Sequence, residues 1–227
     1  VAARAVHAQW GPMARKRSHH QHGTPNRPRF WGRHAVAAAL DNPRRKILRA
    51  WATRDAAAAM NFPKEVAVTF ADVADLGRLV PGDAPHQGVV VEAEPLEEVW
   101  LDEVLGRAGE RAVLLVLDQV TDPHNVGAIL RSAVAFGAGA LITTARHSPQ
   151  ESGVLAKSAS GALEHIDQIE VKNLADALGQ LHDAGFQTIG LDSDGLAELE
   201  KTFAGDKIAL VLGAEGKGLR QKTRETV

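Results

Sequence analysis

The sequence predicts an α/β protein, in which a parallel sheet with helices on both faces follows a smaller α/β unit. Uninterrupted apolar runs, the clearest at 112–117, are typical of strands that are buried on both faces. Helical patterns, such as the one at 174–184, fall between these runs, and strands that alternate with helices form parallel sheets. The other strands expected in this half lie at 140–144, 166–171, 187–191 and 208–212.

The N-terminal half divides into three segments. Residues 1–28 have no hydrophobic period and contain prolines, which is typical of a flexible basic arm. Residues 29–92 predict a small α/β unit, and residues 93–111 an acidic linker that leads into the unit at 112–227. The small unit is expected to hold helices at 33–40, 55–60 and 71–79 and strands at 46–51, 65–70 and 88–92, and the linker a helix around 96–105.

Charge is distributed very unevenly along the 227 residues, whose net charge is −2. Residues 1–54 contain twelve Lys or Arg and one acid, so their formal charge is +11, whereas the remainder carries −13. Aromatic side chains lie among these basic residues and could stack on bases, so we expect the front to bind nucleic acid rather than to serve only solubility. The expected nucleic-acid contacts are Arg15, Lys16, Arg17, Arg29 and Arg33, with Lys157 of the second unit.

Several classes of protein are disfavoured by the composition. The absence of cysteine excludes disulfides and thiolate metal sites, and it fits a cytoplasmic protein. No apolar run approaches the roughly 20 residues of a membrane span. His19, His20 and His22 have no acidic or sulfur neighbour, so we expect no metal site.

The first segment that suggests chemistry begins where the strand at 112–117 ends. Asp122 is a good N-cap and Pro123 suits the first helical position, so a helix is expected to begin there. Arg131 lies off the apolar stripe of this helix, and Gly127 lies one turn earlier on the same side, where it permits a close approach. The stripe predicted to be buried comprises Val126, Ile129, Leu130, Ala133 and Val134.

Asn125 lies in the first turn of the same helix, near the carboxyl end of the strand. Open α/β sheets bind ligands at that edge. The alternative is an ordinary helix with a surface arginine and an incidental glycine.

A glycine-rich bend after the last expected strand is the second such segment. Gly213, Gly216 and Gly218 let the backbone turn sharply and leave its N–H and C=O groups open to a ligand. A dinucleotide loop would follow the first strand instead, and the Lys-Ser/Thr of a phosphate-binding Walker loop is missing.

Together the two segments resemble the SpoU (TrmH-type) branch of the SPOUT RNA 2′-O-methyltransferases, and most closely the bacterial enzymes that modify a guanosine of large-subunit rRNA. The resemblance spans roughly 29–225 and includes the segments 30–36, 86–90 and 157–162. Asn125, Gly127 and Arg131 match the first family motif, and Gly213, Glu215, Gly216 and Gly218-Leu219 match the second.

This resemblance implies a knotted α/β fold, S-adenosylmethionine as cofactor, and a homodimer that methylates a ribose of rRNA, with tRNA as the alternative. It assigns the position at the ribose hydroxyl to Arg131. Of the other two candidate catalytic residues, we expect Asn125 to orient Arg131 or the substrate, with a helix-start cap as the alternative, and Glu215 to pair with Arg131 or hold the glycine loop, with a solvated carboxylate as the alternative. Since arginine keeps its proton, we expect Arg131 to hold the ribose or its phosphate by a forked contact. The cofactor pocket is expected to comprise Leu212, Gly213, Ala214, Glu215, Gly216 and Gly218, with Thr143 and Thr144 as its wall.

One departure leaves alternatives open. The family continues into a third motif, a Ser-Leu-Asn-Val-Ser-like segment, whereas this sequence ends at Val227. Because 222–227 runs on in the style of the family, we expect a tail beyond it rather than an inactive relative that only binds RNA. A nucleotide-binding α/β enzyme unrelated to methylation would require both motif matches to be accidental.

Overall fold

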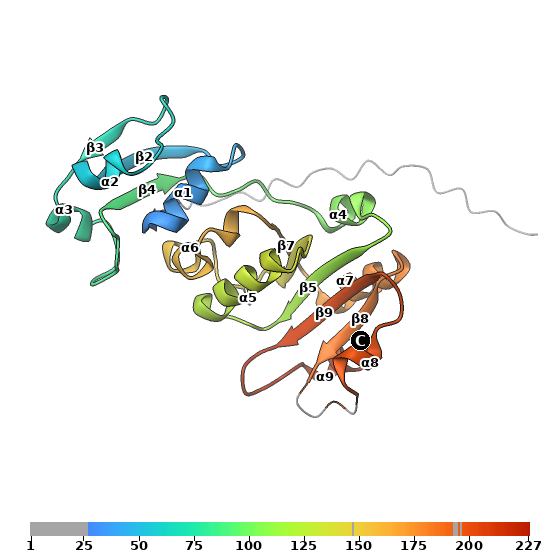
Figure 1. Ribbon diagram of the computed structural model, residues 1–227. Coiled ribbons are helices and arrows are strands. Elements are labelled where there is room, and N and C mark those ends of the chain that lie inside the picture. The colour runs from blue at the N-terminus through green and yellow to red at the C-terminus, as the bar shows by residue number, and fades with distance from the viewer. Residues whose placement is uncertain (1–26, 147, 193–194, 196) are drawn as a thin grey trace, which may run out of the picture.

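A computed structural model of the protein describes residues 27–146, 148–192, 195 and 197–227, which form two sheets with their helices (Figure 1). Arg15, Lys16, Arg17 and the three N-terminal histidines lie outside these residues. The front sheet and its helices comprise β1 (Arg29–Trp31), α1 (Arg33–Asp41), β2 (Ile47–Ala52), α2 (Arg54–Ala58), β3 (Val68–Phe70), α3 (Val73–Gly77) and β4 (Val89–Ala93).

The second half begins with α4 (Leu101–Arg107) and contains the larger sheet. Its elements are β5 (Ala112–Asp118), α5 (Pro123–Ala135), β6 (Ala140–Thr144), α6 (Gly153–Ala159), the 3-10 helix η1 (Ala162–Glu164), β7 (Asp167–Val171), α7 (Leu174–Asp183), β8 (Gln187–Leu191), α8 (Leu199–Thr202), β9 (Lys207–Gly213) and α9 (Gln221–Arg224). All five strands are parallel, in the order β7-β6-β5-β9-β8, which confirms the predicted fold class.

The front sheet has the order β1-β4-β2-β3, with β4 antiparallel to both of its neighbours. Sequence patterns did not reveal β1, because three residues are too few to show a period of two. Of the strand expected at 65–70, only β3 (Val68–Phe70) forms, and it pairs with β2 over three residues.

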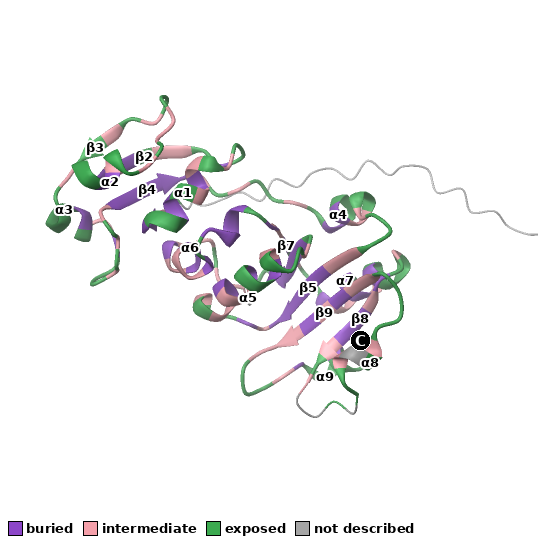
Figure 2. Cartoon of the chain, in the orientation of Figure 1, coloured by how far each residue is buried: buried purple, intermediate pink, exposed green. Residues whose placement is uncertain are grey.

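Alternate side chains of β5 supply two cores, one on each face of the larger sheet. Leu115 and Leu117 face α5 and α6, whereas Leu114 and Val116 face α4 and α7. This alternation follows from the pleat, which points successive side chains to opposite faces. Figure 2 shows the resulting burial, with most of the strand residues buried in the middle of the layers.

Helix α5 begins as predicted, because the Asp122 side chain accepts a hydrogen bond from the His124 amide at 2.9 Å and Pro123 follows it. Val126, Leu130 and Ala133 are buried, but the prediction was wrong for Ile129 and Val134, which are half-buried. The reason lies in α6, which covers the Gly127 side of the helix and thereby rotates the buried stripe toward it.

The helix expected from residue 96 begins at Leu101 instead. Leu96 lies in a segment without regular structure, and its amide donates to the Glu151 carboxylate of the second half at 3.3 Å. That contact uses a backbone donor and is not visible in any local pattern.

Arg45 ties the front unit to the second half through fully buried contacts. Its side chain is 0% exposed and that of Glu164 only 2%, and the two groups meet at 2.7 Å. The guanidinium also donates to the Glu94 carbonyl at 2.9 Å, pairs with Glu151, and lies 4.9 Å from the centre of the Phe30 ring. Burial raises the pKa of Glu151, and the charge of Arg45 opposes that rise.

We expect Arg45→Met to destabilise the protein by about 3–5 kcal/mol, because it leaves buried carboxylates without their cation. The matched control is Arg44→Met, since Arg44 pairs with Asp167 at 3.0 Å while its side chain is 54% exposed. For that exposed pair the loss should stay below about 1 kcal/mol. Urea unfolding of the two variants measures the difference, and equal losses would contradict the role assigned to Arg45.

Candidate active site at the carboxyl edge of the parallel sheet

The carboxyl ends of three neighbouring strands form the edge at which a ligand site was expected. Asp118 at the end of β5 lies opposite Gly213 at the end of β9, and β6 ends beside them at Thr144. In parallel sheets the loops that leave this edge carry the binding groups. The two segments singled out in the sequence, α5 and the glycine bend, both begin here.

The glycine bend (Gly213–Gly218) folds back on itself directly after β9. Ala214 and Gly218 form an isolated bridge, and the Gly218 amide donates to the Ala214 carbonyl at 2.8 Å. A Cβ on Gly213 would lie 2.1 Å from the Gly218 carbonyl carbon, so no other residue fits that position. Gly216 and Gly218 have φ of 73° and 65°, a conformation that favours glycine.

A side-chain contact connects the bend with α5. The Asn125 amide donates to the Glu215 carboxylate at 3.0 Å, although the two residues are 90 positions apart. Two candidate catalytic residues from different motifs are therefore brought together at the mouth of the sheet edge.

Arg131 lies apart from this contact. It is exposed on α5, six residues and roughly 9 Å of helix beyond Asn125. Within the described part of the chain its guanidinium has no hydrogen-bond or ion-pair partner. It is therefore accessible to a substrate or to another chain.

Asp118 is a site residue to which the sequence analysis assigned no role. Its side chain is fully buried and accepts from both the backbone amide and the Nε of Arg220, at 2.9 and 2.6 Å. These bonds hold the chain that leaves the glycine bend against the end of β5. The available signal was an acidic residue that directly follows an uninterrupted apolar strand, where a carboxylate needs partners.

Thr143 and Thr144 are buried at the end of β6, as expected of a pocket wall. The Thr144 hydroxyl oxygen has no hydrogen-bond partner among the described residues. A buried hydroxyl without a partner is costly, so a ligand at this edge would satisfy it.

Gly127 permits a very close packing of α5 on α6. A Cβ at this position would lie 2.5 Å from the Ser158 side chain and 2.8 Å from the Ala159 amide nitrogen. The Ser158 hydroxyl also donates to the His124 carbonyl at 3.1 Å. The close approach predicted at Gly127 is therefore that of a neighbouring helix.

The expected RNA contacts in the described residues lie in different surroundings. Arg29 has partners within the chain, the Glu92 carboxylate at 3.3 Å and the Leu79 carbonyl at 3.2 Å. Arg33 is exposed, and Lys157, which is half-buried, donates to the Gln87 side chain at 2.8 Å.

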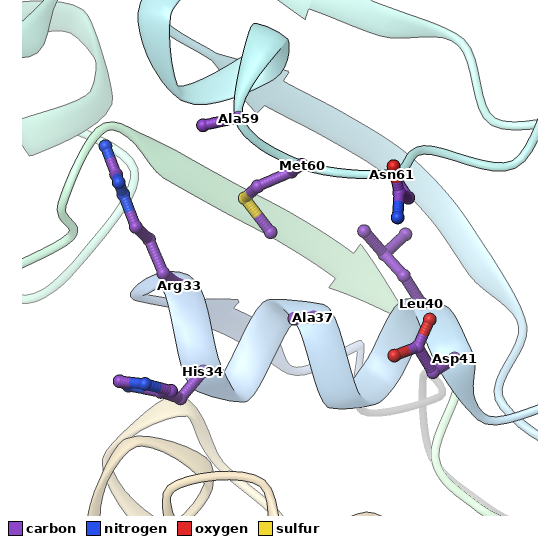
Figure 3. Close-up of a pocket in the computed structure, with 8 residues that line it drawn as sticks. All are labelled: Arg33, His34, Ala37, Leu40, Asp41, Ala59, Met60 and Asn61. Carbon is purple, nitrogen blue, oxygen red and sulfur yellow. The ribbon is translucent and has the colours of Figure 1, made fainter.

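The front unit also contains a groove of about 250 Å³ between α1 and residues 59–61, separate from the sheet edge (Figure 3). Arg33 and Asp41 lie near opposite ends of it, and Met60 points into it. Among the described residues no group of three or more His, Asp or Glu is arranged to hold a metal ion. None of the described helices is long and apolar enough to span a membrane.

Comparison with known families agrees with this geometry. Residues 112–227 match the model of the SpoU rRNA methylase family, and residues 30–99 match that of the RNA 2′-O ribose methyltransferase substrate-binding domain. The chain belongs to the SpoU family of RNA methyltransferases, as its resemblance predicted.

Individual proteins similar to the chain agree with this assignment. The 23S rRNA (guanosine-2′-O-)-methyltransferase RlmB of Ralstonia nicotianae is 42% identical, over 86% of this chain and 81% of its own length. The enzyme of the same name from Pseudomonas putida is 35% identical, over 87% and 83%. The AdoMet-bound rRNA methyltransferase from Sinorhizobium meliloti has the same fold, with a TM-score of 0.71, 22% identity, and coverage of 88% of this chain and 75% of that one.

We expect Gly127→Ala to destabilise the protein, because the added methyl group would meet α6 at 2.5–2.8 Å and force α5 and α6 apart. The matched control is Gly179→Ala in α7, where a Cβ has no neighbour within 4 Å. There alanine should stabilise the helix by up to about 1 kcal/mol. Thermal unfolding of both variants measures whether each substitution lowers or raises the stability. A stabilised Gly127→Ala would contradict this packing.

Proposed function

We propose that the protein transfers a methyl group from S-adenosylmethionine to a ribose 2′-hydroxyl of RNA, and that its target is a guanosine of large-subunit rRNA. The contact of Asn125 with Glu215 carries the proposal, because it joins both family motifs at one sheet edge. The relatives named above carry this activity in their names, and they match most of the chain. Methylation of rRNA would take place in the cytoplasm, where rRNA is assembled into ribosomes.

The residues at the edge fit the cofactor. The bend exposes backbone that no side chain covers at Gly216 and Gly218, and Thr144 offers a buried hydroxyl without a partner in the described chain. We assign the adenosyl pocket to the bend, to Leu212 and to the two threonines. When bound, the cofactor supplies an electrophilic methyl group on a sulfonium.

Catalysis then rests on orientation of the ribose. Arg131 presents an exposed guanidinium fork that can hold the hydroxyl or the adjacent phosphate. Asn125 and Glu215 hold the mouth of the pocket in register with α5. Fixing the reacting atoms in line removes much of the activation barrier. The hydroxyl proton is lost to solvent, because Arg131 and Glu215 are both exposed to it.

A homodimer is part of the proposal, because Arg131 has no partner within the described chain and could complete the site of a second copy. A protein that binds RNA without methylating it is the competing function. It would bind RNA without cofactor and transfer no label from methyl-labelled S-adenosylmethionine. Transfer to tRNA in preference to rRNA would correct the substrate only.

We expect Arg131→Ala and Arg131→Lys each to lower kcat by about 100-fold, because neither residue reproduces the forked contact that orients the ribose. Arg111→Lys is the matched control, since Arg111 is exposed at the opposite edge of the sheet, where it pairs with Asp206 at 3.1 Å. Transfer of labelled methyl groups to rRNA measures the rates. Near-normal turnover of Arg131→Lys would exclude the forked contact.

We expect Thr144→Val to weaken cofactor binding about tenfold without loss of stability, because valine removes only a hydroxyl that has no partner in the described chain. Calorimetric titration with S-adenosylhomocysteine and thermal unfolding measure the two effects. Unchanged affinity for S-adenosylhomocysteine would show that Thr144 is not part of the pocket. Thr188→Val is the control for the loss of a buried hydroxyl that has a partner, since the Thr188 hydroxyl bonds to His182 at 2.7 Å.

A further inference from the structure

Three further sequence segments that match the family meet at one joint between the two units. They are the segments 30–36, 86–90 and 157–162. The joint is formed by β1 and α1, by the turn before β4, and by α6.

Gln87 is the centre of this joint. Its side-chain oxygen accepts two hydrogen bonds, from the Lys157 ammonium at 2.8 Å and from the Arg33 backbone amide at 3.1 Å. A Cβ on Gly32 would lie 2.3 Å from the Lys157 nitrogen, so glycine leaves the space that Lys157 occupies.

The backbone of the joint adopts unusual conformations. Gln87 has φ of 55°, and Gly88, which follows it, has φ of 81°. Gly32, on the other side of the joint, has φ of 85°. A non-glycine residue at positive φ costs free energy, and such residues cluster at functional positions. The left-handed conformation of Gln87 is thus consistent with a site that needs this side chain in one place.

The same stretch of α6 reaches the catalytic helix. Ser158, the neighbour of Lys157, donates to the His124 carbonyl at 3.1 Å and packs on Gly127. One turn of helix thus connects the turn at Gln87 to the first turn of α5, where Asn125 lies.

The two units cannot shift at this joint without breaking other contacts. The apolar core is continuous from Phe30 and Val91 of the front sheet to Leu117 and Leu155 of the second half. Gly153 at the start of α6 packs so closely on β1 that a Cβ would lie 2.2 Å from the Arg29 carbonyl oxygen. The Arg45 contacts add a buried ion pair to the same interface.

We propose that Arg33 and Lys157 form one phosphate-binding site for substrate RNA across this joint, and that Gln87 positions Lys157 within it. The inference rests on the proposed function and extends it to the path of the RNA. Lys157 has three N–H donors, of which Gln87 takes one and no other described residue takes a second, so two can bind phosphate oxygens. The two residues share one acceptor, since the Arg33 backbone amide and the Lys157 ammonium both donate to the Gln87 side-chain oxygen. The exposed side chain of Arg33 extends from the first turn of α1 toward the start of β4 (Figure 3).

The charge and position of this site favour an RNA backbone as its ligand. The partner of Lys157 is a neutral amide rather than a carboxylate. A neutral acceptor fixes the direction of the ammonium without cancelling its attraction for a phosphate. The site therefore holds the backbone in a fixed register with α5, which carries Arg131.

Binding of a fluorescent RNA hairpin of generic sequence tests the site without cofactor, because phosphate contacts do not depend on sequence. We expect Lys157→Ala and Arg33→Ala each to raise Kd roughly tenfold and to reduce the salt slope, log Kobs against log[salt], by about 1. Arg111→Ala, at the opposite edge of the larger sheet, is the matched control and should change neither quantity. Unchanged binding by both site variants would overturn the proposal.

Gln87→Asn and Gln87→Glu test the positioning role. Asparagine tolerates the positive φ but is too short to reach Lys157, so we expect Kd to rise roughly threefold, and no further rise when Lys157→Ala is already present. Glutamate keeps both hydrogen bonds but neutralises Lys157, so RNA affinity should fall while Tm is maintained. Additive effects of Gln87→Asn and Lys157→Ala, or normal affinity of Gln87→Glu, would overturn the role of Gln87.

Methyl transfer by the unmodified protein separates this inference from the proposed function. If the protein transfers methyl groups while the joint variants bind RNA normally, only the phosphate site is wrong. If it binds RNA through the joint and transfers none, the phosphate site stands and the proposed activity is wrong.

Discussion

The pairing of β9 beside β5 is the constraint on which the rest of the structure depends. It places the last strand of the sheet next to the first, in a register that sets Gly213 opposite Asp118. Because parallel strands end at the same edge, the glycine bend and the first turn of α5 have to emerge side by side. The buried Asp118 carboxylate then holds Arg220 beyond the bend and fixes where the loop returns.

The second constraint is that the two units share one apolar core. Residues of the front sheet, α1, β5, α5 and α6 all contribute to it, with the buried Arg45 and Glu164 pair at its margin. A core that continues across both units keeps the front sheet in a defined position relative to α5. Contacts of RNA with the front sheet can therefore influence the position of a ribose at the sheet edge.

Sequence patterns predicted most of the larger sheet because its signals are local. Its buried strands are apolar runs, and α5 has both a capping aspartate and a proline at its start. Where the prediction was wrong, a distant segment decided the outcome. Packing of α6 on Gly127 rotated the buried stripe away from Ile129 and Val134, and the segment before α4 bonds to Glu151 of the second half through the Leu96 amide.

The sequence by itself determined the fold class, the start of α5, the glycine bend and the family, because each depends on residues close together in the chain. Only the tertiary structure decided that Asn125 meets Glu215, that Asp118 holds Arg220, and that Gln87 meets Lys157. These partners are separated by 90, 102 and 70 positions. No local period records such pairs, since strand order and domain packing bring them together.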